Sequence, residues 1–422
     1  MKVAFVSQPG FAVLPPAGSI EIVTRELARR LAARHDVTIY GSAEPGLEDV
    51  SDELIRYRFI AHGRDAAITR VLRPLYRKRP ADRGFFTSPA HQLLYWVRVA
   101  KDIRRSGCDV VHVANLTQAV PVIRRVNPDV RIVLHMHCEW LVQLDGRLME
   151  RRLRDVDLIV GCSEHITAPI RRRFPAHAAR CRTIHNGVEI GPEVDRGSRD
   201  GAVTVLHVGR ISPEKGHHVL IEALNEVVRE HPETRLVLVG EESVVPAEWA
   251  VDISSDPAVR GLKRFYGRSY LEQVREMMSP ELAERTTWTG RLGYEECARR
   301  YADADLFVFP SYFEAMPVPP IEAMASGLAV VSAPAGGAVE SIRDGETGVF
   351  VERGDARALA RAVNELIEDP ARRAALGAAG RARAIETFSW DRVATEFESA
   401  LAGGGGAGAA PGGISVAAVA GL

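Results

Sequence analysis

Short apolar runs alternate with amphipathic stretches along almost the whole chain of 422 residues, and this alternation limits the folds open to it. Short apolar runs bounded by polar residues are typical of buried strands, while apolar positions three and four apart are typical of helices. Repetition of strand and helix predicts parallel sheets that helices cover on both faces. The predicted strands of the first half are 2–7, 36–40, 109–113, 131–135, 156–160 and 182–184, with helices at 19–34, 90–105 and 163–173.

The pattern breaks at 186–201, where Asn-Gly and Gly-Pro pairs precede a polar run that is typical of a linker. The alternation then begins again, and the length allows two domains, each with its own core. The sequence therefore predicts an α/β protein of two doubly wound domains with a cleft between them. The predicted second-half strands are 203–208, 235–239, 286–289, 305–309 and 328–331, with helices at 216–230, 292–302, 319–326 and 389–401.

Composition narrows the function classes. The chain is 46% hydrophobic and 26% charged, as soluble globular proteins are, and its net charge of −1 predicts no nucleic-acid partner. Five widely spaced cysteines suggest neither disulfides nor zinc, and no apolar run is long enough to span a membrane. We expect a cytoplasmic protein. The Gly/Ala-rich tail, 402–422, is expected to be flexible.

Two glutamates lie close to the start of a predicted helix. Glu314 follows the apolar strand 305–309, and Glu322 comes after two prolines suited to a first helical turn. We therefore expect Glu322 at the N-terminal end of the helix and Glu314 in the loop before it. Ligands of open α/β sheets bind at this end of a strand, where free amides favour phosphate. Alone, the pair is equally consistent with a helix-dipole partner and a solvated loop charge.

A second loop carries two cations. Arg210 and Lys215 lie between the first predicted strand and the first predicted helix of the second half. Cations at this place can neutralise a diphosphate leaving group, which stabilises a transition state by several kcal/mol where water is scarce. An ordinary charged loop remains the alternative for the pair taken alone.

Together these residues carry a family resemblance. The chain resembles the retaining glycosyltransferases of family 4, whose GT-B fold consists of two Rossmann-like domains facing a cleft. The resemblance covers about residues 1–401 and is strongest in 182–350. The matching motifs are Ser163-Glu164, His185-Asn186-Gly187-Val188-Glu189, Gly209-Arg210 with Glu214-Lys215-Gly216, Glu314 to Glu322, Gly336-Gly337 with Glu340, and Phe388-Ser389-Trp390.

The resemblance implies a domain plan and a donor site. Residues 1–187 would form the acceptor-side domain and 188–388 the nucleotide-sugar domain, with helix 389–401 returning to the first. Arg210 and Lys215 would hold the donor diphosphate. Glu322 would bond the ribose hydroxyls, and Glu314 would contact the transferred sugar. Backbone amides would complete the pocket, and these belong to Met316 and Val318.

The first domain adds two residues by the same resemblance. Gly18 precedes a helix where relatives often have two adjacent glycines near the donor phosphate or acceptor, so the match is partial. A simple turn capped by Ser19 is the alternative. His137 matches the position from which relatives present a histidine to the donor sugar, and a buried structural histidine is the alternative. His135, two residues earlier, is expected to be structural.

The implied activity is transfer of a hexosyl-type group to an acceptor hydroxyl with retained anomeric configuration. It would need no metal and no cofactor. The acceptor would be a glycan, a lipid-linked sugar or a small molecule. A GT-B nucleotide-sugar epimerase and a non-catalytic nucleotide-sugar-binding protein are the alternatives. Conversion of a nucleotide sugar in an assay without acceptor would indicate the epimerase. Donor binding without turnover would indicate the non-catalytic binding protein.

A basic stretch stands apart from these motifs. Residues 56–105 contain thirteen Arg or Lys and three Asp or Glu, and leucines and a tyrosine interleave with the arginines near 70–83. Such a charge run is usually a solvated surface. An anionic acceptor or a peripheral membrane contact is the alternative that this mixture of residues keeps open.

Overall fold

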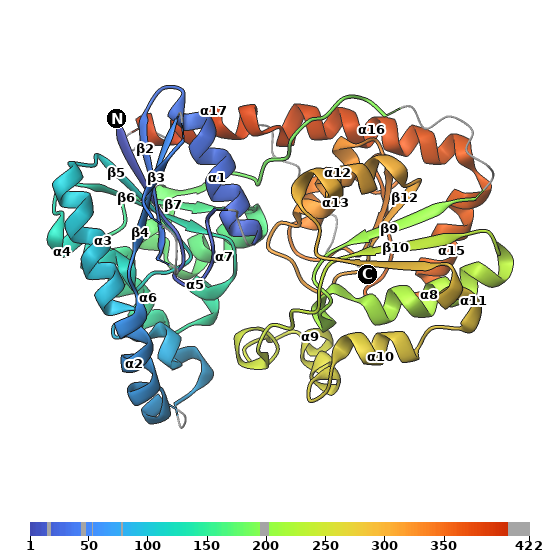
Figure 1. The fold of residues 1–422 in the computed structure, drawn as a ribbon, viewed down its shortest axis with the longest axis horizontal. Helices are drawn as coiled ribbons and strands as arrows, with labels where there is room; N and C mark the ends of the chain where they lie inside the picture. Colours follow the sequence, from blue (N-terminus) through green and yellow to red (C-terminus); the bar gives the residue numbers. More distant parts are fainter. Residues whose placement is uncertain (15–17, 44–47, 53, 77–78, 195–201, 404–422) are drawn as a thin grey trace.

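The computed structural model describes residues 1–14, 18–43, 48–52, 54–76, 79–194 and 202–403. These residues form two α/β halves side by side, each with its own sheet (Figure 1). The prediction of two Rossmann-like domains is confirmed. The polar run at 195–201 and the tail from residue 404 lie outside the described residues. No helix in the described part of the chain is both long and apolar enough to cross a bilayer.

The first sheet has the strand order β3-β4-β2-β1-β5-β6-β7-β8 among the described residues. Every neighbouring pair is parallel except β3 with β4. Parallel strands buried on both faces need continuous apolar runs, which is why the sequence pattern located most of them. The bounds are β1 (Lys2–Val6), β2 (Asp36–Ser42), β3 (Val50–Ser51), β4 (Ile55–Ile60), β5 (Val110–Ala114), β6 (Arg131–Met136), β7 (Leu158–Gly161) and β8 (Cys181–Thr183).

Helices cover both faces of this sheet (Figure 1). Helix α1 begins at Ser19 with Gly18 as its N-cap residue, so the alternative of a turn capped by Ser19 is wrong by one position. The helices are α1 (Ser19–Ala32), α2 (Gly63–Leu72), α3 (Leu93–Ser106), α4 (Ala119–Val126), α5 (Trp140–Gln143), α6 (Gly146–Leu153) and α7 (Glu164–Arg173), with 3-10 turns η1 (Arg73–Tyr76), η2 (Ala81–Arg83), η3 (Phe85–Thr87) and η4 (Pro175–Arg180).

The second sheet is parallel throughout, with the order β11-β10-β9-β12-β13-β14 among the described residues. Strand β9 lies at its centre, so the loop that follows β9 opens at the middle of the carboxyl edge, beside the loop that follows β12. The bounds are β9 (Thr204–Val208), β10 (Arg235–Val239), β11 (Thr286–Gly290), β12 (Leu306–Phe309), β13 (Ala329–Ser332) and β14 (Val349–Phe350).

The helices of the second half include two long ones that the sequence pattern did not locate, α15 and α16. Alanine and arginine dominate α16, so large apolar residues give it little periodicity. The elements are η5 (Pro213–Lys215), α8 (His217–Glu230), η6 (Ala247–Trp249), α9 (Pro257–Gly261), η7 (Leu262–Phe265), α10 (Tyr270–Glu276), α11 (Pro280–Glu284), α12 (Tyr294–Asp303), α13 (Val318–Ala325), α14 (Ala338–Ser341), α15 (Ala356–Glu368), α16 (Pro370–Phe388) and α17 (Trp390–Ala402).

The last helix connects the halves. Helix α16 runs along the second half, and α17 continues across the top of the first (Figure 1). Arg30 of α1 forms an ion pair with Asp391 at 3.3 Å, and His35 contacts Glu398 at 2.8 Å. The ring of Trp390 lies so close to Gly187 that a Cβ there would come within 2.3 Å of it. The crossover at 186–190 therefore packs directly on the start of α17.

Candidate active site

The loop between β9 and α8 carries both predicted diphosphate cations. Gly216 has φ of +73°, and a Cβ there would come within 2.1 Å of the carbonyl oxygen of Pro310. Only glycine lets this loop approach the end of β12 so closely. Arg210 donates to Glu214 Oε1 at 3.0 Å and to the Ser243 carbonyl at 3.2 Å. Its side chain is nearly half exposed, whereas Glu214 is buried.

Lys215 and Glu314 meet directly. Lys215 Nζ donates to Glu314 Oε1 at 2.5 Å, and Ser311 Oγ donates to the same oxygen at 2.6 Å. Both charged side chains are largely buried, at 16% and 11% exposure. Ser311 also bonds the Glu214 carbonyl at 2.9 Å, so the loops after β9 and β12 are fixed to each other. The structure thus brings together a cation and a carboxylate that are 99 residues apart.

Glu322 lies elsewhere in the helix than expected. Helix α13 begins at Val318, so Pro319 and Pro320 are inside its first turn and Glu322 follows that turn. The predicted place at the very start of the helix is wrong, because two prolines are tolerated within a first turn, whose N–H groups have no helical partner. The carboxylate accepts a hydrogen bond from Tyr301 Oη at 2.8 Å. Burial raises the pKa of Glu322, and the bond from Tyr301 opposes that rise.

The segment from Glu314 to Val318 also contacts the first half. Ser163 Oγ donates to the Ala315 carbonyl at 2.6 Å, and Asn186 Nδ2 donates to the Met316 carbonyl at 3.2 Å. These contacts use carbonyls. Val318 is the first helical residue, so its N–H is one of the amides that a helix leaves free for a ligand.

A second contact between the halves is centred on Glu340 of α14. Its carboxylate accepts hydrogen bonds from the backbone N–H groups of Glu164 and His165 at 2.7 and 2.8 Å, and contacts His185 Nε2 at 3.0 Å. Burial alone would raise the pKa of Glu340, but these hydrogen bonds lower it below its usual range. A carboxylate of the second half thus caps helix α7 of the first.

His137 follows β6 at the carboxyl edge of the first sheet. Its backbone N–H donates to Asn115 Oδ1 at 2.7 Å, and its ring lies against that of His135 with centroids 4.0 Å apart and a tilt of 36°. Burial lowers the pKa of His137 to about 4, so the imidazole is neutral at pH 7. His135 is buried and contacts His112 Nε2 through Nδ1 at 3.0 Å. The described residues give the Nε2 atom of His137 no hydrogen-bond partner.

Gly18 has a carboxylate beside it that the sequence did not indicate. A Cβ at Gly18 would come within 2.7 Å of Glu21 Oε2, so a larger residue there would make this carboxylate shift. Glu21 is buried, and desolvation raises its pKa. The preceding residues 15–17 lie outside the described part of the chain.

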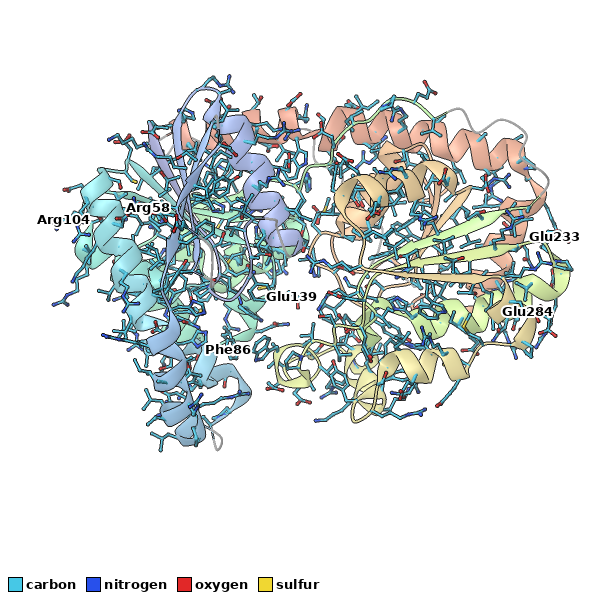
Figure 2. The ribbon with its side chains drawn as sticks, viewed as in Figure 1. Arg58, Phe86, Arg104, Glu139, Glu233 and Glu284 are labelled. Atoms are coloured by element: carbon cyan, nitrogen blue, oxygen red, sulfur yellow. The ribbon has the colours of Figure 1, made fainter. Side chains whose placement is uncertain are left out.

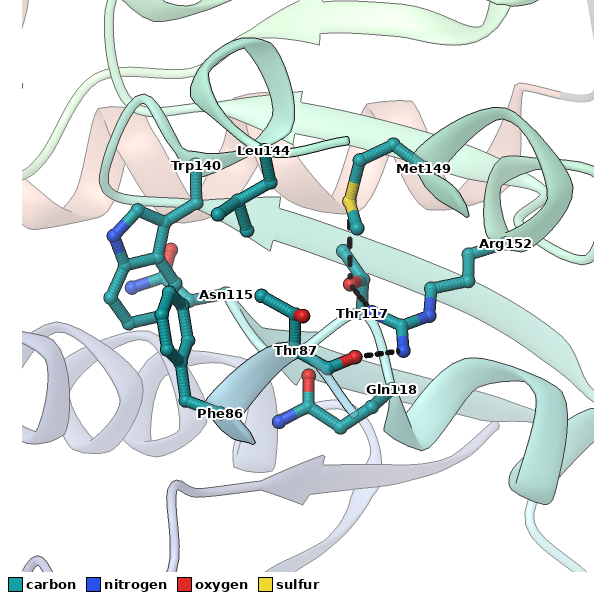
Figure 3. A pocket seen from close by; sticks show the side chains of 9 residues that line it. All are labelled: Phe86, Thr87, Asn115, Thr117, Gln118, Trp140, Leu144, Met149 and Arg152. Atoms are coloured by element: carbon teal, nitrogen blue, oxygen red, sulfur yellow. Dashed lines mark hydrogen bonds between the residues drawn. The ribbon is translucent and has the colours of Figure 1, made fainter. Parts of the chain in front are cut away.

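A small cavity opens at the carboxyl edge of the first sheet (Figure 3), with a volume of about 10 Å³. Phe86 and Trp140 lie on one side, with ring centroids 5.4 Å apart, and Arg152 lies on the other. Phe86 also approaches Trp249 of the second half, with centroids at 6.2 Å. Figure 2 shows Phe86 and Glu139 on the side of the first half that faces the second.

The predicted site residues therefore form two groups. Lys215, Glu314 and Arg210 gather on adjoining loops of the second half, with Glu322 close behind on α13. His137 and Gly18 lie in the first half, and no direct contact joins them to the others in the described residues. Sequence reasoning missed Tyr301 and Arg152, because their partners are distant in sequence. It also missed Ser311 and Glu21, which belong to no motif that the sequence offered. The described residues contain no group of three or more His, Cys, Asp or Glu placed to hold a metal.

Comparison with known proteins adds to this geometry. The family described as Glycosyl transferases group 1 matches residues 194–383, and Glycosyltransferase Family 4 matches residues 20–191. Spore coat protein SA of Bacillus subtilis is 25% identical over 94% of this chain and 98% of its own length. A GDP-mannose-dependent alpha-(1-6)-phosphatidylinositol monomannoside mannosyltransferase of Mycolicibacterium smegmatis is 27% identical over 92% of this chain and 96% of its own.

Solved structures show the same fold. Sucrose-phosphate synthase from Thermosynechococcus elongatus superposes with a TM-score of 0.71 at 23% identity, covering 95% of this chain and 98% of that one. Anabaena HepE in complex with UDP and glucose gives 0.67 at 19% identity, covering 95% and 99%. The Glycosyltransferase Family 4 match covers the half that contains the first sheet, and the group 1 match covers the half that contains the second. The chain therefore belongs to the GT-B glycosyltransferases of the group 1 and family 4 type.

Proposed function

We propose that the protein transfers a hexosyl-type group from a nucleotide-diphosphate sugar to an acceptor hydroxyl with retention of the anomeric configuration. The observation that carries this proposal is the 2.5 Å contact between Lys215 Nζ and Glu314 Oε1. A cation for the diphosphate and a carboxylate for the sugar must lie side by side, because these two parts of a donor are joined by one bond. Arg210, on the same loop as Lys215, supplies the second cation.

The relatives support the donor class. The mannosyltransferase from Mycolicibacterium smegmatis depends by name on GDP-mannose, and Anabaena HepE has been solved with UDP-glucose. Both donors join a sugar to a nucleoside diphosphate. We assign the diphosphate to Arg210 and Lys215, the ribose hydroxyls to Glu322, and the backbone amides of Met316 and Val318 to the rest of the donor pocket.

The proposed reaction is a front-face displacement. The acceptor oxygen bonds to the anomeric carbon on the face that the diphosphate leaves, as the bond from that carbon to the diphosphate oxygen breaks. The hydroxyl proton passes to the departing phosphate oxygen. Arg210 and Lys215 stabilise the charge that develops on the leaving group, and the loops hold the reactants in position.

His137 has a positioning role in this proposal. Because its pKa is lowered to about 4, the imidazole is uncharged at pH 7 and acts as a hydrogen-bonding group. The backbone bond to Asn115 fixes the residue after β6. We expect His137→Ala to lower kcat for transfer more than the affinity for free nucleotide, because its partner would be the sugar. An unchanged kcat would make His137 structural.

The decisive experiment replaces both cations. Arg210→Ala with Lys215→Ala should abolish binding of UDP and GDP in calorimetry while the circular dichroism spectrum is retained, because the diphosphate loses both partners. The matched control is Arg229→Ala, an exposed arginine at the far end of α8, which should bind as the wild type does. Unchanged affinity in the double variant would refute the assignment.

Three further measurements define the reaction. Product anomers read by NMR should keep the configuration of the donor, and inverted product would refute retention. Turnover should persist in excess EDTA, because the proposal assigns the diphosphate charge to protein cations. Conversion of one nucleotide sugar into another without acceptor would indicate an epimerase instead.

The basic segment 70–83 of the first half, called the arm below, concerns where the protein acts in the cell. We propose a cytoplasmic enzyme whose segment 70–83 meets an anionic surface or acceptor. Val71 and Leu75 of α2 and η1 are each 71% exposed, beside the exposed Arg70 and Arg73. Apolar and basic side chains exposed together are typical of segments that contact acidic membranes.

A further inference from the structure

The cavity beside Trp140 is built almost entirely by the acceptor-side half. It lies where β5 and β6 end, because Thr117 and Gln118 follow β5 and Trp140 follows β6. Asn115 also lines the cavity, and its Oδ1 accepts a hydrogen bond from the backbone N–H of His137 at 2.7 Å, so the cavity adjoins the residue proposed to face the donor sugar. Its volume of about 10 Å³ has room for one water-sized group.

One wall of the cavity is a buried cation without a counter-ion. Arg152 of α6 is 3% exposed. It donates to Thr117 Oγ1 at 2.9 Å and to the Thr87 carbonyl at 2.6 Å, and both oxygens are neutral (Figure 3). No ion pair joins Arg152 to a carboxylate among the described residues. Burial lowers its pKa to about 10, so the guanidinium is still charged at pH 7. A buried charge left unpaired is costly, and a bound anion would relieve that cost.

A second donor points to the same ligand. Gln118 is 5% exposed, and its Nε2 has no hydrogen-bond partner among the described residues. The two neutral oxygens next to it, on Thr87 and Thr117, already accept from Arg152. Arg152 and Gln118 Nε2 are therefore two donors without an anionic partner among the described residues, and together they favour a negatively charged oxygen acceptor.

The other wall is aromatic. Phe86 and Trp140 are partly exposed, and Trp249 approaches Phe86 from the second half. Flat aromatic faces pack well against the apolar face of a sugar or polyol ring. The cavity therefore offers a polar end for one oxygen atom and a rim for a ring.

We propose that this cavity is an acceptor subsite that binds an oxygen of a phosphate or carboxylate group, with the acceptor ring packed against Phe86 and Trp140. The inference rests on the proposed transferase function and specifies its acceptor as an anionic one. Arg152 and Gln118 donate to the anion, and the ring remains at the rim because only one oxygen fits inside. The acid group could belong to a soluble sugar phosphate, a sugar acid or the headgroup of a lipid acceptor.

The test uses paired probes on the full-length protein, with and without saturating UDP or GDP. Calorimetry compares glucose 6-phosphate with glucose, and glucuronate with glucose. Flotation compares vesicles of phosphatidylcholine with and without phosphatidylinositol. At least one charged probe should bind at least about tenfold more tightly than its neutral partner. Equal binding of charged and neutral probes in every pair would overturn the inference.

Variants assign the preference to the cavity. Arg152→Met should weaken binding of the charged probe about 10- to 100-fold, as expected for lost hydrogen bonds to a charged group. Arg151→Met, which removes the exposed neighbour on the same helix, should change it little. Gln118→Glu keeps the shape of the side chain but supplies an internal carboxylate, so it should also remove the preference. The inference fails if the preference survives Gln118→Glu or is lost equally in Arg151→Met.

The nucleotide titration separates this inference from the proposed function. Arg152 lies in the first half, so Arg152→Met should bind UDP or GDP as the wild type does. If nucleotide binds but the charge preference is absent, only the acceptor subsite fails. If the charge preference is present but no nucleoside diphosphate binds, the proposed function fails and the anion site stands.

Discussion

The cations of the two halves have different hydrogen-bond partners. In the second half, Lys215 and Arg210 each contact a carboxylate, at 2.5 and 3.0 Å. In the first half, Arg152 donates hydrogen bonds to two neutral oxygens and pairs with no carboxylate among the described residues. In the proposed donor site, a diphosphate would therefore compete with Glu314 and Glu214 for these cations. In the proposed acceptor subsite, an anion would meet an Arg152 that forms no ion pair with a carboxylate among the described residues. If both proposed sites hold, a donor would replace carboxylate partners that the cations already have, whereas an acceptor anion would give Arg152 its first charged partner.

Both halves contain buried histidines, and the largest expected effect is the loss of stability that they cause at acid pH. Burial lowers the pKa of His112 in the first half to about 3 and that of His207 in the second to about 4. An unfolded histidine has a pKa of about 6.5, so below pH 6.5 these imidazoles become protonated in the unfolded chain but stay neutral in the folded one. Stability is thus complete above pH 6.5 and falls as the pH drops toward 4. The buried imidazoles are His112, His135, His137, His207, His217 and His218.

We expect each such histidine to remove about 1.4 kcal/mol of unfolding free energy per pH unit in this window. Urea titrations at pH 7.5, 6.5 and 5.5 should show a midpoint that falls steeply. His112→Gln combined with His207→Gln should flatten the dependence by roughly 2.7 kcal/mol per pH unit. A variant with the wild-type slope would show that these rings are protonated in the folded protein.

The next effect concerns Glu322, which accepts a hydrogen bond from Tyr301 and forms no ion pair with a cation among the described residues. Glu322→Gln should weaken binding of UDP or GDP about 10- to 100-fold, because a hydrogen bond from ribose to a charged carboxylate contributes about 1.5–3 kcal/mol. Tyr301→Phe should have a smaller effect at pH 7 but should move the acid limit of binding to higher pH, because the lost bond lets the pKa of Glu322 rise. Calorimetry against pH measures both, and an unmoved acid limit would separate Tyr301 from the site.

A smaller effect is expected on the arm of the first half. Arg70→Ala with Val71→Ala should reduce binding to vesicles that contain acidic lipid, because each basic residue near such a surface contributes about 1 kcal/mol. Salt should weaken the wild-type binding through screening. Arg229→Ala, an exposed arginine of the second half, is the matched control. Equal co-sedimentation with neutral and acidic vesicles would show that segment 70–83 is a solvated surface that binds no acidic lipid.

The sequence predicted the sheets well and their side-chain partners poorly. Strand β10 occupies 235–239 as predicted, because a parallel strand buried on both faces is a continuous apolar run. The sequence pattern did not locate strand β4, because Arg56 and Arg58 interrupt its apolar residues near the sheet edge. The acidic and basic residues of the donor loops were located by motif, but the pairing of Lys215 with Glu314 was not. Arg152 gave no signal, because it stands in an arginine-rich run in which Arg151 and Arg154 are exposed and only the packing of α6 buries it.

The smallest expected effect tests the exchange of partners itself. In the free protein Glu314 forms an ion pair with Lys215. In the proposed donor site, a diphosphate must displace this carboxylate before it can interact with the full charge of the ammonium group. Glu314→Gln removes the competing charge but keeps the shape, and it should bind sugar-free UDP or GDP about two- to fivefold more tightly than the wild type. Glu365→Gln, which alters an exposed ion pair with Arg372 on α15 and α16, serves as the control and should not change the affinity. Because the gain comes from a charge, it should shrink as salt increases. Weaker nucleotide binding in Glu314→Gln would show instead that Glu314 holds Lys215 in the orientation that the diphosphate needs.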